Sequence, residues 1–243
     1  MTRREVLQGS ALIGLGIGMQ RKARSGVGES YVSQRPAPGK REFTSRAVDT
    51  SRAVEETIAS VKARIGDPKL AWMFENCFPN TLDTTVNFRM VDGKPDTFVI
   101  TGDIDAMWLR DSSAQVWPYL PLAKDDANLR RMIEGLIRRQ SASTLIDPYA
   151  NAFMPDPNAK PLRWAVHDKT TMKPGVGEQK WAIDSLCYPI RLAHGYWKNT
   201  GETAPFDERW KAAARATVAM FREQQREPGL LPRHGSRRNR RAT

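Results

Sequence analysis

The sequence is organised around a stretch that reads Thr101-Gly102-Asp103-Ile104-Asp105-Ala106-Met107-Trp108-Leu109-Arg110-Asp111-Ser112-Ser113. Its glycine and aspartates indicate a turn, and the spacing of apolar residues over 114–120 predicts a helix directly after it. We expect Asp111 or Ser112 to cap this helix, because a short oxygen side chain accepts hydrogen bonds from the first free backbone N–H groups. Trp108 and Arg110 would then lie just before the helix, where loops often present functional side chains.

The residue types in this turn suit the binding of a sugar ring. Arg110 and Asp111 form a charged fork for neighbouring hydroxyl groups, and Trp108 offers an apolar plate for the C–H face of the ring. Asp105 is a further candidate carboxylate in the same turn. The alternative is a structural ion pair next to a core tryptophan.

The chain has 243 residues and a formal net charge of +11, and this charge is located at its two ends. Residues 1–46 hold nine Lys or Arg and three Glu, residues 228–243 hold five Arg and no acid, and residues 47–227 hold 24 basic and 24 acidic residues. A nucleic-acid-binding domain usually carries its basic residues as a patch on the folded part. We therefore expect no nucleic-acid partner; a binder acting through its arginine tail is the alternative.

Residues 1–46 are predicted to be a twin-arginine-type export signal followed by a linker. Arg3 and Arg4 precede a glycine-diluted apolar run over 11–19, which is much shorter than the roughly 20 residues that span a bilayer. The prediction is export to the periplasm or the exterior without a stable membrane anchor. The alternative is a disordered basic tail.

Cysteine and histidine spacing indicates no metal site, and no cofactor is expected. Cys77 and Cys187 lie far apart, and the three histidines show no ligand pattern. We expect both cysteines to be buried free thiols; a single disulfide is the alternative in an exported protein.

Residues 47–227 are predicted to be a mostly helical domain with one short β-hairpin, which covers 86–100 with its turn at Asp92-Gly93. The helix predictions cover 48–65, 69–77, 125–146, 179–200 and 206–226. The inward side of the helix over 125–146 is expected to consist of Leu129, Met132, Ile133, Leu136 and Ile137. That of the helix over 179–200 is expected to consist of Ile183, Leu186, Cys187, Ile190 and Trp197.

A second group of candidate residues lies in and after the irregular segment 147–178. A loop of this length in a compact domain is usually functional or disordered. The candidates are His167, Asp168, Trp181 and Asp184. Trp181, Asp184 and Tyr188 have the spacing of one helix face, and a carboxylate between two aromatic rings again suits a sugar. The alternative is that Asp184 is an ordinary polar residue near a helix start.

With both groups in view, the sequence resembles the metal-independent exo-α-mannosidases of glycoside hydrolase family 125. The segments that carry the resemblance are Gly102-Asp103-Ile104, then Met107-Trp108-Leu109-Arg110-Asp111-Ser112, then the run from Trp181 through Asp184-Ser185-Leu186-Cys187-Tyr188-Pro189-Ile190-Arg191-Leu192. It covers about 48–226, and Ala182 departs from it, because an acidic residue is expected there in this family.

The resemblance implies an (α/α)6 barrel, an inverting mechanism and α-mannoside glycans as partners, with terminal α-1,6-linked mannose as substrate. The turn with Trp108, Arg110 and Asp111 also looks like the turn that holds the terminal sugar in glucoamylase-type barrels. Inversion needs a carboxylic acid and a carboxylate base, roughly 6.5–9.5 Å apart. In this family both are expected further along the chain than residue 243, so about half of the barrel is expected here, and Asp184 is a catalytic candidate only if that expectation fails.

Residues 228–243 are rich in arginine and have no periodicity. The expectation is a shifted reading frame, since the resemblance is expected to stop near Arg226; a genuine basic tail that binds acidic partners is the alternative. Two functions remain in view: an exported inverting α-mannosidase represented by its N-terminal portion, and a non-catalytic or degenerate glycan-binding protein.

Overall fold

The structure, a computed structural model, describes residues 31–37, 40–42 and 51–225. Contacts divide the chain into one unit of residues 1–31 and a second of residues 32–243, and every element named below belongs to the second unit. The predicted export signal and the predicted arginine-rich tail lie outside the described residues.

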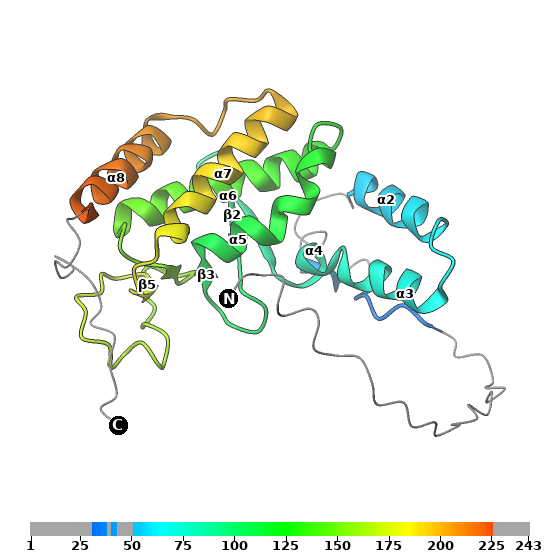
Figure 1. Ribbon diagram of the computed structural model, residues 1–243, viewed down its shortest axis with the longest axis horizontal. Helices are drawn as coiled ribbons and strands as arrows, with labels where there is room; N and C mark the ends of the chain where they lie inside the picture. The colour runs from blue at the N-terminus through cyan, green and yellow to red at the C-terminus, as the bar shows by residue number, and fades with distance from the viewer. Residues whose placement is uncertain (1–30, 38–39, 43–50, 226–243) are drawn as a thin grey trace, which may run out of the picture. The chain divides into compact units, whose positions relative to one another are not determined.

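The described part is mostly helical, as predicted (Figure 1). Its α-helices are α2 (Arg52–Lys62), α3 (Pro68–Cys77), α4 (Asn80–Thr84), α5 (Leu109–Val116), α6 (Ala127–Ile146), α7 (Ile183–Thr200) and α8 (Glu208–Gln224), and a 3₁₀ turn, η3, covers Trp117–Leu122. Its strands are β1 (Val86–Val91), β2 (Lys94–Val99), β3 (Met107–Trp108), β4 (Ala152–Phe153) and β5 (Val176–Glu178). The first two strands form one sheet and the other three form a second sheet in the order β3-β4-β5.

The predicted β-hairpin is confirmed. β1 and β2 pair antiparallel, with Val91 opposite Lys94. The two residues between them, Asp92 and Gly93, have φ values of 50° and 74°. Both residues of a type I′ turn need positive φ, which is why Asp-Gly is a preferred sequence there.

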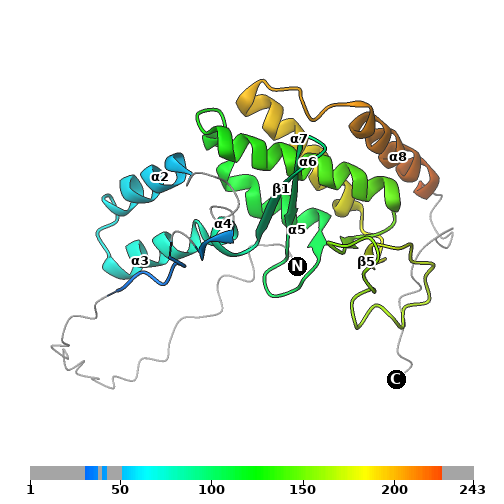
Figure 2. The same cartoon turned by 180° about the vertical axis from the view of Figure 1, so that it is seen from behind.

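The hairpin packs closely on α6 (Figure 2). A Cβ added to Gly135 would lie 3.0 Å from the backbone nitrogens of Asp96 and Thr97. The hydroxyl of Thr97 donates a hydrogen bond of 2.7 Å to the carbonyl oxygen of Met132. The absence of a side chain at Gly135 therefore lets the strand lie directly on the helix backbone.

The long helix α6 forms the centre of the core and has the buried side that the sequence predicted. Asp126 caps it by accepting hydrogen bonds from the N–H groups of Asn128 and Leu129. The predicted inward residues Leu129, Met132, Ile133, Leu136 and Ile137 are all buried. α6 packs against α7 and α8, and α7 packs against α5 (Figure 1).

The buried side of α7 differs from the prediction. Among the five residues expected to point inward, only Leu186 is buried, whereas the other buried members of the helix are Ser185, Leu192, Ala193, Gly195 and Tyr196. Gly195 explains part of this orientation, because an added Cβ would lie 2.9 Å from the side chains of Leu120 and Trp117. The predicted face is instead the outer one, on which Ile183, Ile190 and Trp197 are exposed.

The cysteines also differ from the prediction. Cys77 and Cys187 are free, and both are exposed rather than buried. Cys77 is the last residue of α3, a helix with no buried residue, and Cys187 lies on the outer face of α7. The sequence alone did not show which helix faces are covered.

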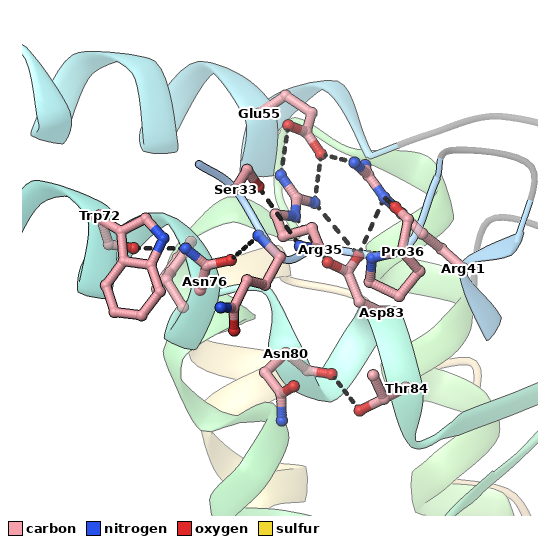
Figure 3. A network of polar contacts seen from close by, with 12 residues as sticks. Ser33, Arg35, Pro36, Arg41, Glu55, Trp72, Asn76, Asn80, Asp83 and Thr84 are labelled. Atoms are coloured by element: carbon pink, nitrogen blue, oxygen red, sulfur yellow. Dashed lines mark hydrogen bonds and ion pairs between the residues drawn. The ribbon is translucent and has the colours of Figure 1, made fainter. Parts of the chain in front are cut away.

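A polar network attaches Arg35 and Arg41 to the helices (Figure 3). The guanidinium of Arg35 donates to the carboxylates of Glu55 in α2 and Asp83 in α4, with a shortest distance of 2.7 Å to Asp83. Arg41 also contacts both carboxylates. Burial lowers the pKa of Arg35, but the bonds to Glu55 and Asp83 outweigh it and raise this pKa above its ordinary value. This part of the predicted linker is therefore held against the folded unit.

Candidate active site

The start of α5 differs from the predicted arrangement. The helix begins at Leu109 with Trp108 as its N-cap residue, so Arg110 and Asp111 lie in its first turn rather than before it. The Leu109 N–H donates to the Asn151 carbonyl oxygen at 3.1 Å. The hydroxyl of Ser112 donates back to the Leu109 carbonyl oxygen, so Ser112 does not cap the helix.

Gln140 of α6 holds this first turn in place through side-chain hydrogen bonds. Its side-chain nitrogen donates to the hydroxyls of Ser112 and Ser113 at 2.9 and 2.8 Å. All three side chains are buried. These two bonds hold the backbone that carries Arg110 and Asp111, while Gln140 Oε1 is buried without a hydrogen-bond partner among the described residues.

Arg110 joins the two predicted groups of candidate residues. One of its guanidinium nitrogens lies 3.1 Å from Asp184 Oδ2 and another lies 3.2 Å from Asp111 Oδ2. Asp111 and Asp184 lie in the first turns of α5 and α7, where the helix dipole favours a negative charge. The structure thus brings together residues separated by more than 70 positions along the chain.

The electrostatics of this cluster keep it charged while it remains accessible. The bond to Asp184 raises the pKa of Arg110, burial opposes this effect, and the charges of Asp111 and Asp184 add to it. The side chains of Arg110, Asp111 and Asp184 are 42%, 31% and 41% exposed. The second oxygen of Asp184 has no hydrogen-bond partner among the described residues. That oxygen is itself buried, so the cluster offers a ligand a partly exposed cation held by two partly exposed carboxylates.

Trp108 lies next to this cluster on strand β3. It is opposite Ala152 of β4, and it packs on a small buried core made of Ala106, Leu162 and Ala165. Its indole is half-buried. Asp105, in the turn before β3, is exposed, and within the described part of the chain no hydrogen bond or ion pair joins it to Arg110.

The long irregular segment carries the other candidates at its surface. His167 is exposed, and Asp168 is half-buried with one carboxylate oxygen 3.8 Å from Lys180 Nζ. The segment is held by β4 and β5, which extend the short sheet that begins with β3.

Trp181 is not part of the predicted helix face. α7 begins at Ile183, so Trp181 precedes the helix. Its sequence spacing to Asp184 and Tyr188 therefore does not place the three residues on one helix face. Trp181 instead lines a cavity of about 540 Å³ together with Asp147, Tyr149 and Gln179. The prediction that this indole frames Asp184 on one helix face was therefore wrong.

Sequence reasoning missed a buried carboxylate between these groups. Glu178 at the end of β5 is buried, and it accepts hydrogen bonds from Asn151, Trp164 and Lys180. Burial raises the pKa of Glu178, but the bonds from Lys180, Asn151 and Trp164 outweigh it and hold the pKa below its ordinary value. The available signal was an acidic residue at the end of a strand, placed between two candidate segments.

Two features are absent from the described part of the chain. No group of three or more His, Cys, Asp or Glu side chains in that part of the chain converges as metal ligands would. In the same part, no helix combines the length and the apolar character needed to cross a membrane.

Comparison with known proteins identifies the family. Residues 67–239 match the family model described as metal-independent alpha-mannosidase (GH125). A match over most of the chain shows that the chain belongs to this family, as the two motifs had indicated.

Two relatives define the extent of the similarity. The Meiotically up-regulated gene 157 protein of Schizosaccharomyces pombe is 41% identical over 198 residues, which are 79% of this chain and 38% of that protein. A solved metal-independent alpha mannosidase of Streptococcus pneumoniae, in a non-productive complex with alpha-1,6-mannobiose, is 44% identical with a TM-score of 0.66. That match covers 72% of this chain and 40% of the other. The chain thus spans less than half the length of both relatives.

These matches confirm the predicted fold class and correct one boundary. The helices and short strands are consistent with part of the (α/α)6 barrel of the solved relative. The family match continues to residue 239, so the expectation that the resemblance stops near Arg226 was wrong. The shifted reading frame over 228–243 stays a prediction, because these residues lie outside the described part of the chain.

Proposed function

We propose that the Arg110 cluster and Trp108 hold the terminal mannose of an α-mannoside, as part of an inverting exo-α-1,6-mannosidase. The observation that carries this proposal is the joining of Arg110, Asp111 and Asp184 at the adjacent first turns of α5 and α7. A guanidinium presents its N–H groups in a planar fork, which can donate to neighbouring hydroxyls of one sugar ring. The carboxylates accept hydrogen bonds from the same hydroxyls, and the half-buried indole of Trp108 covers an apolar ring face.

The remaining candidates are proposed to contact parts of the glycan around this ring. Asp105, His167 and Asp168 come from the two segments beside Trp108 and can bond hydroxyls at the surface. Trp181 is proposed to contact a sugar through the cavity it lines with Asp147. The linkage proposed for the substrate follows the family resemblance and the α-1,6-mannobiose bound to the solved relative.

We further propose that the acid and base of hydrolysis are not supplied by this cluster. Inversion places the two carboxyl groups on opposite faces of the sugar. Asp111 and Asp184 instead share one guanidinium, an arrangement that favours holding a substrate over exchanging a proton. The catalytic pair is therefore assigned to parts of the family barrel outside these 243 residues, and Asp184 is the residue to test first if turnover is found.

Binding and hydrolysis by the purified chain test the proposal. Calorimetric titration with α-1,6-mannobiose is expected to show binding that Arg110→Lys weakens at least tenfold, because lysine cannot replace a planar fork that bonds two carboxylates. Arg131→Lys, at an exposed position of α6, is the matched control. No binding by the unmodified chain would contradict the proposed site, and hydrolysis of the disaccharide by this chain would contradict the assignment of the acid and base elsewhere.

Two alternatives are separated by the same measurements. Binding without turnover fits both the N-terminal portion of an enzyme and a non-catalytic glycan-binding protein. Comparison with the α-1,2- and α-1,3-linked mannobioses then decides, because preference for the α-1,6 linkage favours the enzyme class.

Export by residues 1–46 is a separate proposal, based on Arg3, Arg4 and the apolar run that follows. Transport of a reporter fused to these residues, and its loss in a double lysine variant of the two arginines, tests it.

A further inference from the structure

The side chain of Trp164 combines exposure with fixed orientation. Its indole is 47% exposed, although tryptophan is among the most costly side chains to leave in water. Its Nε1 nevertheless donates a hydrogen bond of 3.0 Å to Glu178 Oε1. The indole ring is therefore exposed, while its hydrogen bond to the buried carboxylate of Glu178 fixes its orientation.

Both carboxylate oxygens of Glu178 accept hydrogen bonds. Its side chain is 8% exposed, and its other carboxylate oxygen accepts from Asn151 Nδ2 at 2.6 Å. Lys180 Nζ lies 2.6 Å from the oxygen that the indole also uses, and the Lys180 N–H donates to Asn151 Oδ1 at 2.8 Å. A carboxylate with these partners cannot rotate without leaving buried polar groups unpaired, which is costly. The orientation of the indole follows from this clamp.

The same clamp is attached to the candidate sugar site. The carbonyl oxygen of Asn151 accepts the hydrogen bond from Leu109, the residue before Arg110. Leu162 and Ala165, on either side of Trp164 in the sequence, form the small core on which Trp108 packs. Two hydrogen-bonded residues, Glu178 and Asn151, thus connect the exposed indole of Trp164 to the start of α5.

We infer that Trp164 is a stacking platform for a second sugar ring, the one to which the terminal mannose is linked, and that Glu178 is the positioning residue that orients it. This inference rests on the proposed function, because it needs the terminal ring at the Arg110 cluster. A ring that is oriented before binding loses little conformational entropy when a sugar stacks on it. The ligand class is a mannoside of at least two rings.

Two ligands of different length test the inference. Methyl α-D-mannoside fills only the terminal position, whereas α-1,6-mannobiose also reaches the second. Trp164→Ala is expected to lower the affinity for the disaccharide about tenfold, the range of one aromatic contact, and to change that for the monosaccharide less than twofold. Trp164→Phe, which keeps a ring without the N–H, is expected to fall between the unmodified chain and Trp164→Ala.

A matched control and a positioning variant separate stacking from general damage. Trp197 is 46% exposed on α7, so Trp197→Ala removes an equally exposed indole and is expected to leave both affinities unchanged. Glu178→Gln keeps an acceptor for the indole and is expected to retain most of the disaccharide affinity, whereas Glu178→Leu is expected to reduce it selectively. The ¹H–¹⁵N indole signal that disappears in Trp164→Phe is expected to shift on adding disaccharide but not monosaccharide.

The outcomes distinguish the two proposals. If the unmodified chain binds neither sugar, the proposed function is wrong and this inference falls with it. If both sugars bind and Trp164→Ala leaves the ratio of their affinities unchanged, the inference alone is overturned. An equal loss for both sugars would likewise overturn it, because it would show that Trp164 supports the whole site rather than the second ring.

Discussion

The buried ion network around Arg35 allows a quantitative prediction for the stability of the folded unit. The side chains of Arg35 and Asp83 are 8% and 4% exposed, and the shortest distance between their charged groups is 2.7 Å. In the variant Arg35→Ala, the Asp83 carboxylate stays buried, and the remaining cation, Arg41, lies 3.6 Å away. Breaking a buried pair from one side typically costs 3–5 kcal/mol. Because Arg41 keeps part of the compensation, we expect a loss of about 3 kcal/mol in the free energy of unfolding.

Urea unfolding followed by circular dichroism measures this loss. Arg52→Ala is the matched control, since it removes an arginine paired with Glu56 at a position 88% exposed, where an ion pair contributes little. The double variant Arg35→Met with Asp83→Leu removes both charges, and it is expected to recover most of the stability, because no unpaired buried charge remains. An unfolding midpoint of Arg35→Ala equal to that of the control would refute the reasoning.

Three further predictions concern backbone packing and pH. Gly135→Ala should destabilise by about 1–3 kcal/mol through overpacking against the β2 backbone, whereas Gly66→Ala, with no atom within 4 Å of its new Cβ, should not lower the melting temperature. Gly93→Ala should cost about 1 kcal/mol, because its φ of 74° is unfavourable for a side chain; equal melting temperatures would contradict this turn. Because the pKa of Glu178 is lower in the folded protein than its ordinary value of 4.5, the ionised carboxylate stabilises the fold. This contribution is complete at pH values above 4.5, and it is lost as the pH falls through the lower pKa of the folded state. Acid titration of unfolding should therefore be shallower in Glu178→Gln, and identical titrations would contradict the assignment.

Local signals in the sequence were sufficient for the hairpin and for α6. Asp92-Gly93 specifies its turn through backbone geometry alone, and Asp126 caps α6 with its own side chain. Both features depend on residues that are neighbours in the sequence. They could therefore be predicted without knowledge of the packing.

The start of α5 and the buried side of α7 depend on distant residues. α5 begins before Asp111 because its first turn is fixed by Gln140 and by the Asn151 carbonyl. α7 has apolar residues on both sides, and the side that is buried is the one where Gly195 allows close approach to Trp117. The period of a sequence identifies the faces of a helix but does not tell which face a neighbour covers.

The candidate site was predicted in part for the same reason. Arg110, Asp111 and Asp184 were named from their residue types and motifs, and the structure brings them together. Glu178 and Asn151 were not named, because their importance comes from hydrogen bonds between segments rather than from a local pattern. Functional residues that act by holding others leave little signal in one sequence.

The three-stranded sheet has a consequence for how the protein is made. β3, β4 and β5 contribute two or three residues each, and they come from segments separated by all of α6 and by the long loop. Contacts between distant segments form slowly, since the chain between them must first be ordered. During synthesis the turn with Arg110 leaves the ribosome well before β5 and Asp184. The helices around α6 can therefore form early, while the surface formed by Arg110, Asp111 and Asp184 is expected to be among the last parts of the unit to assemble.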